Sequence, residues 1–234
     1  MFFPYYFDPT LMILLPAIIL ATYAQVKVQA TYSRYSKVRS HRGMTGAEVA
    51  RAILDRNQLY NVPIEITKGT LTDHYDPRTK VLRLSPDVYH STSIASIGVA
   101  AHEVGHAVQD QIRYAPFNFR MAIVPLANIG SRLSMPFLFI GLLLRNELLV
   151  NIGVYAFGLA VLFQLVTLPV EFNASRRAVS ALETGGYIGP DEVGPTRNVL
   201  RAAALTYVAA TLMAALQLIR LMLISGMFGR RRDD

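Results

Sequence analysis

The sequence predicts a mainly α-helical integral membrane protein with about four transmembrane helices and a small α+β domain. Hydrophobic residues make up 52% of the 234 residues, and the mean hydropathy is positive, which is unusual for a soluble protein. Several apolar runs are long enough to cross about 30 Å of hydrocarbon at about 1.5 Å per helical residue. The polar stretch after the first run is long enough to fold as a small domain.

Changes in hydropathy along the chain predict five parts. They are an N-terminal membrane anchor (1–30), a polar part with a metal-binding motif (31–118), a transmembrane hairpin (119–170), a helix followed by a loop (171–201), and a C-terminal transmembrane helix with a basic tail (202–234).

The anchor is the apolar run 10–26. The residues before it contain one charged side chain, Asp8, whereas Lys27 and four more basic residues follow it by position 42. A cleaved signal peptide would carry Lys or Arg before its apolar core. We therefore expect an uncleaved anchor whose N-terminus lies outside the cell.

The polar part begins with a predicted helix. Thr45 and Glu48 form a T-x-x-E capping box, and apolar residues then recur at helical spacing over 46–57. Ser91 or Thr92 is expected to cap a second helix, which carries the metal-binding motif and ends before a proline at 116.

Between these helices the sequence predicts two short strands. The stretches VPIEIT (62–67) and KVLRLS (80–85) alternate or contain β-branched residues. The polar stretch DHYDPRT (73–79) that separates them is interpreted as a loop.

Two further apolar runs predict the hairpin. The first, 121–144, contains Pro125, Arg132 and Pro136, and its first third is expected either to cross the membrane or to lie along the interface. The second, 148–169, carries no formal charge. Because only three residues separate the runs, we expect a tight pair of antiparallel helices.

The last third of the chain is expected to contain a charged helix (171–183), a Gly/Pro-rich loop (184–196) and a final apolar helix (202–228). If the hairpin crosses twice, residue 171 returns to the side of the polar part. That side holds most of the Lys and Arg residues, so the positive-inside rule makes it cytoplasmic, in the plasma (inner) membrane of a bacterium. Four crossings then place the tail GRRRDD outside, against the rule, unless the last run does not fully cross.

The polar part contains an H-E-x-x-H motif formed by His102, Glu103 and His106. Residues four apart on a helix share one face, so both imidazoles can bind one metal ion, and Glu103 lies about 60° round the helix. Zinc bound there would lower the pKa of water towards about 7, and Glu103 could accept its proton during hydrolysis of an amide. Five histidines and seven glutamates give a chance expectation of roughly 0.003 for the motif.

A zinc site needs a third protein ligand. The chain has no cysteine, and Gln109 and Ile112 occupy the positions of the glycine and third histidine of metzincins. The candidates are Glu171, Asp110, His90 and His74. We favour Glu171, because an acidic residue directly after a membrane-spanning run is costly and is therefore expected to have a function.

Three runs resemble the YugP-type membrane zinc metallopeptidases of bacteria. They are LTDHYDPRTKVLRLSPDVY (71–89), GVAAHEVGHAVQD (98–110) and VEFNASRRAV (170–179), and the resemblance covers nearly the whole chain. That family is similar in plan to the HtpX-type gluzincin membrane peptidases. The resemblance implies a gluzincin-like metallopeptidase domain.

The resemblance also implies roles for single residues. His102, His106 and Glu171 are expected to bind Zn²⁺, with Glu103 as the catalytic base. Gluzincins commonly carry an aspartate four residues after the ligand glutamate, but this chain has Ser175 there. We expect Ser175 or Asn173 to orient a ligand histidine instead.

The sequence does not identify a donor to the oxyanion that forms during hydrolysis. The candidates are Tyr75, Tyr89, Arg176, Arg177 and His74, and His74 is preferred as a catalytic residue because its loop could fold over the site. If the stretch 80–84 is an edge strand, it could pair with the backbone of an extended substrate.

The leading hypothesis is a membrane-embedded zinc endopeptidase that cleaves membrane or unfolded proteins. Its partners would be a peptide or protein substrate and the lipid bilayer, and nothing in the sequence indicates nucleic-acid binding or an oligomeric state. The alternatives are a zinc-binding membrane scaffold or adaptor without catalysis, and an anchor that binds anionic lipids without a metal.

Overall fold

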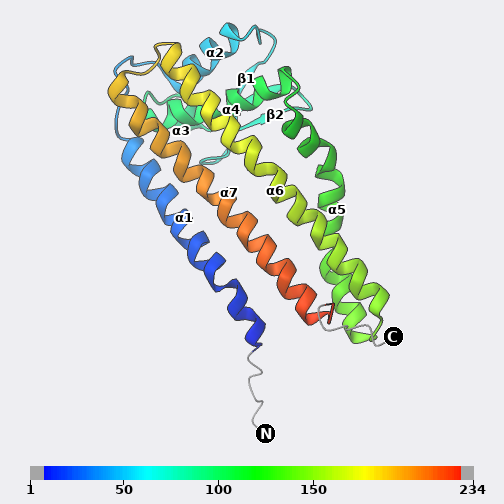
Figure 1. Cartoon of the computed structure of the whole chain (residues 1–234). Helices are drawn as coiled ribbons and strands as arrows, with labels where there is room; N and C mark the ends of the chain where they lie inside the picture. The colour runs from blue at the N-terminus through cyan, green and yellow to red at the C-terminus, as the bar shows by residue number, and fades with distance from the viewer. Residues whose placement is uncertain (1–7, 228–234) are drawn as a thin grey trace. The chain divides into compact units, whose positions relative to one another are not determined.

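The computed structural model describes residues 8–227, so the basic tail lies outside the described residues. Four of its helices are long and apolar enough to cross a membrane (Figure 1). They are α1 (Leu15–Tyr35), which continues a 3₁₀ helix η1 (Pro9–Leu14), α5 (Ala115–Leu143), α6 (Glu147–Thr184) and α7 (Pro190–Ile224). The prediction of a mainly α-helical chain with four such helices is confirmed.

The described chain folds as two compact units. Unit 1 contains residues 8–23, 120–166 and 207–227, and unit 2 contains residues 24–119 and 167–206. Unit 1 is made of the apolar parts of the four long helices. Unit 2 contains the remaining elements and every residue of the predicted metal site.

In unit 1, the predicted hairpin of α5 and α6 is present. A turn of three residues joins the two helices, and the side chain of Asn146 accepts a hydrogen bond from the Leu149 N–H at 3.2 Å, which caps α6. Pro125 and Pro136 lie inside α5 without ending it. Elsewhere in unit 1, the Asp8 carboxylate binds the Arg220 guanidinium at 2.6 Å.

Unit 2 combines helices with a small sheet. The helices are α2 (Gly46–Arg56), α3 (Pro86–Tyr89) and α4 (Ile94–Gln111), and the strands are β1 (Ile64–Ile66), β2 (His74–Asp76) and β3 (Val81–Leu84). The capping box of Thr45 and Glu48 is formed at the start of α2, as predicted. Apolar faces of α2, α4, α6 and β3 share one core, in which Leu54, Leu82, Ile97 and Leu182 are fully buried.

The sheet differs from the prediction in two respects. The strand order is β1-β3-β2, with β1 and β3 parallel and β2 antiparallel to β3. The stretch 73–79, predicted as a loop, therefore contains the edge strand β2. The stretch 80–84 is the central strand rather than an edge, because β1 pairs with one side of it and β2 with the other.

Three helix boundaries also differ. Ser93, not Ser91 or Thr92, caps α4, and its hydroxyl accepts the Ser96 N–H at 3.2 Å. The charged helix predicted at 171–183 is the last part of α6, which continues through Pro169.

The third difference concerns the Gly/Pro-rich loop predicted at 184–196, because α7 already begins at Pro190. Proline suits the first position of a helix, where its missing N–H is not needed. The Glu192 carboxylate accepts the Gly189 N–H at 2.7 Å and closes the first turn of α7.

Candidate metal centre

The two histidines of the motif lie one turn apart on α4. Their ring centroids are 4.8 Å apart and the rings are nearly perpendicular. His106 is buried, and the His102 side chain is 14% exposed. Small residues at 100, 101, 105 and 107 allow neighbouring elements to approach this helix closely.

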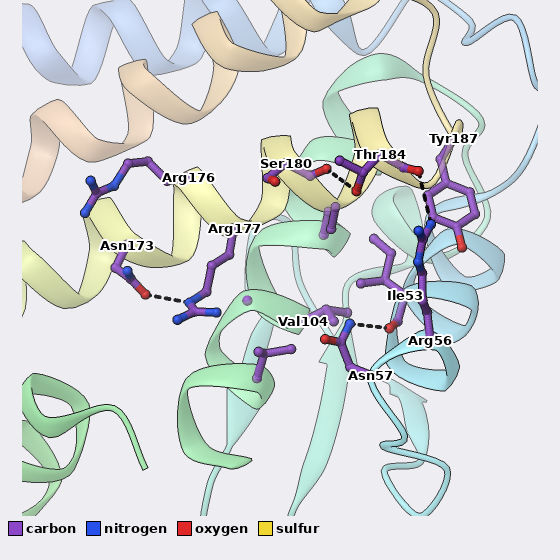
Figure 2. Close-up of a pocket in the computed structure, with 14 residues that line it drawn as sticks. Ile53, Arg56, Asn57, Val104, Asn173, Arg176, Arg177, Ser180, Thr184 and Tyr187 are labelled. Carbon is purple, nitrogen blue, oxygen red and sulfur yellow. Dashed lines mark hydrogen bonds between the residues drawn. The ribbon is translucent and has the colours of Figure 1, made fainter. Parts of the chain in front are cut away.

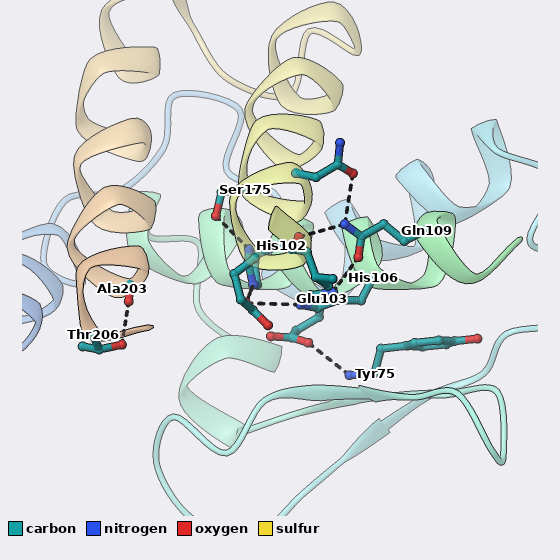
Figure 3. A network of polar contacts seen from close by, with 11 residues as sticks. Tyr75, His102, Glu103, His106, Gln109, Ser175, Ala203 and Thr206 are labelled. Carbon is teal, nitrogen blue, oxygen red and sulfur yellow. Dashed lines mark hydrogen bonds and ion pairs between the residues drawn. The ribbon is translucent and has the colours of Figure 1, made fainter. Parts of the chain in front are cut away.

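Helix α6 brings Glu171 to the same point, 65 residues after His106. Figure 3 shows His102 and His106 of α4 with Ser175 of α6 beside them. One carboxylate oxygen, Oε2, lies 3.3 Å from His102 Nε2 and 3.6 Å from His106 Nε2. The ligand atoms of the three residues all lie within 4.8 Å of one another. The structure therefore places together the three residues predicted as zinc ligands.

Gly105 makes this approach possible. A Cβ atom at this position would lie 2.8 Å from the Ala174 carbonyl oxygen, closer than real Cβ contacts. Without a side chain there, α4 can contact the backbone of α6 at Ala174, three residues after Glu171. The glycine inside the motif is thus required by the packing that delivers the third residue.

Gln109 fixes the protonation of His106. Its amide nitrogen donates to the Val170 carbonyl at 2.8 Å and to Asn173 Oδ1 at 3.0 Å, so its oxygen faces His106 Nδ1 at 2.9 Å. A carbonyl oxygen only accepts, so Nδ1 carries the hydrogen. The lone pair of Nε2 then points towards His102 and Glu171, as a metal ligand requires.

Asn173 is held in turn by Arg177, whose Nε donates to Asn173 Oδ1 at 2.8 Å. Ser175 has a similar role for the other ligand, because its Oγ lies 3.2 Å from His102 Nδ1. Each histidine therefore has a side chain holding its Nδ1. This arrangement supports the expectation that Ser175 orients a ligand histidine, and it places Asn173 one step further away, behind Gln109.

Glu103 points towards the edge strand. Its carboxylate accepts the Tyr75 N–H of β2 at 3.0 Å. The pKa of Glu103 is raised to about 7, chiefly because the carboxyl group has lost solvation. The carboxylates of Glu171 and Asp73 contribute to this rise, and His102 and the Tyr75 N–H oppose it. A carboxyl group with a pKa near neutrality can both accept and donate a proton.

These residues fit zinc. Two neutral imidazoles and one carboxylate form a common set of three protein ligands for catalytic zinc, and a fourth position stays available for water or substrate. Hydrogen bonds that orient the imidazoles are the usual support of such sites. Among the described residues, these three form the only group of His, Cys, Asp or Glu side chains that could hold a metal ion in this way.

The other candidates for the third ligand lie elsewhere. Asp110 accepts hydrogen bonds from the Tyr75 hydroxyl, at 2.7 Å, and from Lys80. His90 is exposed at the end of α3, next to the ring of Tyr89. His74 is exposed on β2, and its Nδ1 lies 2.8 Å from the Thr72 carbonyl oxygen.

Several of the residues considered as hydrogen-bond donors to the oxyanion make other contacts. The Tyr75 hydroxyl is bound to Asp110, Tyr89 packs against the core of unit 2, and Arg176 and Arg177 line a separate cavity. His74 is exposed beside Tyr75, whose N–H binds Glu103. Gln109 was not predicted as a positioning residue, although its spacing of three residues after His106 is a signal that could have identified it.

Comparisons with known proteins identify the family of this chain. A family model described as "Putative neutral zinc metallopeptidase" matches residues 10–226. The protein named "Putative membrane protease YugP" from Bacillus subtilis (strain 168) is 49% identical over 216 residues, which cover 92% of this chain and 94% of that protein. No solved structure matches.

Proposed function

Because this chain belongs to the neutral zinc metallopeptidase family, we propose that it is a membrane-embedded zinc endopeptidase that cleaves peptide bonds of membrane or unfolded proteins. The observation that carries the proposal is the cluster of His102, His106 and Glu171 with Glu103 beside it. The cluster combines residues of two helices far apart in the chain. A structural zinc site would normally contain four protein ligands.

The residues of the site suit hydrolysis of an amide. A zinc ion at the site would polarise the scissile carbonyl and lower the pKa of a water molecule towards about 7. Glu103 would accept a proton from that water and deliver it to the amine nitrogen as the C–N bond breaks, so one water yields a carboxylate and an amine. The Tyr75 N–H holds the Glu103 carboxylate in place. We retain His74 as the proposed oxyanion donor.

The edge strand β2 offers a place for the substrate. Since β3 is central, the outer edge of the sheet beside Glu103 belongs to β2, and the Tyr75 N–H of this strand is bound to Glu103. We infer that a substrate in extended conformation pairs with this edge through backbone hydrogen bonds. Backbone pairing would make the enzyme tolerant of different side chains and selective for unfolded or flexible segments.

The charge distribution supports a cytoplasmic site. Of the 23 Lys and Arg residues, sixteen belong to unit 2, four to the described part of unit 1 and three to the tail. Unit 2 also contains the end of α1, the start of α5, the end of α6 and the start of α7. If each of these helices crosses the membrane once, all four of these ends lie on the same side. By the positive-inside rule, this distribution supports the proposal that unit 2 lies in the cytoplasm and the protein in the bacterial plasma membrane.

The test compares wild type with Glu103→Gln and His106→Ala in the full-length, detergent-solubilised protein. We expect Glu103→Gln to retain one zinc per chain and to lose about 10²–10⁴-fold in cleavage of an unfolded casein substrate. His106→Ala should lose both zinc and activity. Wild type with bound zinc but no cleavage of any unfolded substrate would favour the scaffold, and a metal-free wild type would favour the lipid-binding anchor.

A further inference from the structure

A basic groove lies in unit 2, between the last part of α1 and the first part of α7 (Figure 1). Its volume is about 500 Å³. None of the described residues that line it is acidic, and the sequence has no Asp or Glu at 24–35 or at 193–206. The groove therefore concentrates positive charge from two helices. The polar side chains that line it are those of Lys27, Thr31, Arg34, Tyr35, Asn198 and Arg201.

The groove lies where both helices meet the end of an apolar run. Lys27 directly follows the apolar run 10–26, and Arg201 directly precedes the stretch 202–219 of α7, which carries no formal charge. Leu205, inside that stretch, also lines the groove. Because lipid headgroups extend about 5–8 Å beyond the hydrocarbon on each side, the groove lies at the level of the headgroups.

Arg34 and Arg201 face the groove from opposite helices at nearly the same level. Helix α1 leads from unit 1 into unit 2 and α7 leads back, so the two helices run in opposite directions there. Arg201 lies near the middle of the α7 stretch that lines the groove, 198–205, and Thr31 near the middle of the α1 stretch, 27–35. Arg34 is three residues beyond Thr31, which is about 4.5 Å along the helix. One phosphate group between the helices is therefore within reach of both guanidinium groups.

Both guanidinium groups keep their hydrogen-bond donors for a ligand. Within the described part of the chain, neither the Arg34 nor the Arg201 guanidinium forms a hydrogen bond or an ion pair. The Arg34 guanidinium lies 5.4 Å from the centroid of the Tyr35 ring, which also lines the groove, and this contact keeps it there. Each guanidinium has five N–H groups, arranged so that two of them can bind one phosphate group together.

A second polar cavity of unit 2, between α2, α4 and α6, does not gather its cations in this way (Figure 2). There the Arg56 guanidinium donates to the Thr184 carbonyl at 3.1 Å, and Arg177 Nε donates to Asn173 Oδ1 at 2.8 Å. These two contacts lie eleven residues apart along α6, or about 16 Å. That cavity therefore serves as a comparison and not as a second anion site.

We propose that the groove between α1 and α7 binds the phosphate headgroup of an anionic phospholipid. Phosphate oxygens accept paired N–H donors from guanidinium groups, and basic pockets between transmembrane helices are known sites for anionic headgroups. A lipid fits better than free phosphate because the groove lies at the end of two apolar runs, beside which acyl chains can pack. The site goes beyond the proposed peptidase function and does not depend on it.

The test uses the full-length protein and three variants. The main variant combines Arg34→Gln with Arg201→Gln. The matched control combines Arg113→Gln with Arg176→Gln, which removes the same charge from exposed positions of unit 2 outside the groove. The third variant, Ala30→Phe, fills the groove from an exposed position of α1 and removes no charge.

Two arms distinguish a lipid headgroup from free phosphate. The first uses nanodiscs of phosphatidylcholine with increasing fractions of phosphatidylglycerol, and counts the phosphatidylglycerol that stays bound in native mass spectrometry. The second measures binding of inorganic phosphate to the protein in detergent by calorimetry. Thermal unfolding of each variant shows whether it keeps its fold.

We expect wild type to retain phosphatidylglycerol saturably and in preference to phosphatidylcholine. The Arg34 and Arg201 variant should bind it at least tenfold more weakly at an unchanged Tm, Ala30→Phe should lose binding similarly, and the matched control should stay within twofold. If the Arg34 and Arg201 variant has a lower Tm, Ala30→Phe decides alone.

The proposal is overturned if wild type shows no preference for phosphatidylglycerol, or if the groove variants bind it as wild type does. An equal loss in the matched control would also overturn it, because the effect would then be due to general surface charge. Saturable binding of inorganic phosphate without a preference for phosphatidylglycerol would do the same, because the ligand would then be free phosphate.

Discussion

The histidine and glutamate residues of the metal centre could be predicted for different reasons. His102, Glu103 and His106 belong to one turn of one helix, so their spacing alone indicates a metal site. Glu171 follows from counting membrane crossings and from its acidic character beside an apolar run. The spacing of Gln109 places it next to His106, but the orientation of its amide depends on the Val170 carbonyl and on Asn173 of another helix, which the sequence did not indicate.

The role assigned to Gln109 predicts a specific loss of metal affinity. Gln109→Leu would keep the volume of this fully buried side chain but remove the acceptor for the His106 Nδ1 hydrogen. We expect zinc affinity to fall about 10–100-fold, as for other residues that orient a ligand histidine. Competition with a fluorescent chelator measures it.

The control for Gln109 is Gln111→Leu, at the exposed end of the same helix, where the amide donates to the Asn57 carbonyl. It should bind zinc as wild type does. Equal zinc affinity in both variants would show that Gln109 does not fix the tautomer of His106.

Ser175 stands where gluzincins commonly carry an aspartate, and its contact with His102 Nδ1 predicts the effect of two substitutions. Ser175→Ala removes the acceptor and should weaken zinc binding about tenfold. Ser175→Asp supplies a charged acceptor and should bind zinc at least as tightly as wild type. Chelator competition measures both, and a Ser175→Asp protein that binds more weakly than Ser175→Ala would contradict this role.

The sequence correctly predicted those helix boundaries that depend on contacts between residues a few positions apart. The capping box defines the start of α2 because both of its hydrogen bonds lie within four residues. The strand β2 was missed because it has three residues in a polar stretch and exists through its pairing with β3. The continuity of α6 through Pro169 was missed because proline normally ends a helix, whereas neighbouring helices can compensate for it in a membrane protein.

The contact between α4 and α6 predicts a difference between two glycines. Gly105→Ala places a Cβ 2.8 Å from the Ala174 carbonyl oxygen and should separate the helices, which costs about 1–3 kcal/mol and weakens zinc binding. Gly194→Ala, in α7 of the same unit, has no atom within 4 Å of its new Cβ and should be neutral or stabilising by up to about 1 kcal/mol. Thermal unfolding in detergent and zinc content measure the two effects.

If Gly105→Ala unfolds at the same temperature as Gly194→Ala and keeps its zinc, the close approach of the two helices does not position Glu171. A lower Tm with normal zinc affinity would instead show that the contact supports the fold and not the metal centre.

On the scale of the whole chain, the order of the apolar runs was enough to predict four membrane crossings. The side of the membrane on which unit 2 lies is predicted from the distribution of charge instead. The ion pair of Asp8 with Arg220 is consistent with four crossings, because it joins the start of η1, which leads into α1, to the last part of α7. The three arginines of the tail oppose the positive-inside rule, and two acidic residues directly follow them. A direct measurement of sidedness is therefore informative.

The absence of cysteine makes this measurement simple, since each introduced cysteine is the only thiol in the chain. We predict that a membrane-impermeant maleimide added to intact cells does not label Arg78→Cys in unit 2 but does label Arg145→Cys, in the turn between α5 and α6. Asp234→Cys should be labelled like Arg145→Cys, because an even number of crossings separates them. After lysis all three should react. Labelling of Arg78→Cys in intact cells would place the metal centre outside the cytoplasm, and protection of Asp234→Cys with labelling of Arg145→Cys would mean that α7 does not complete its crossing.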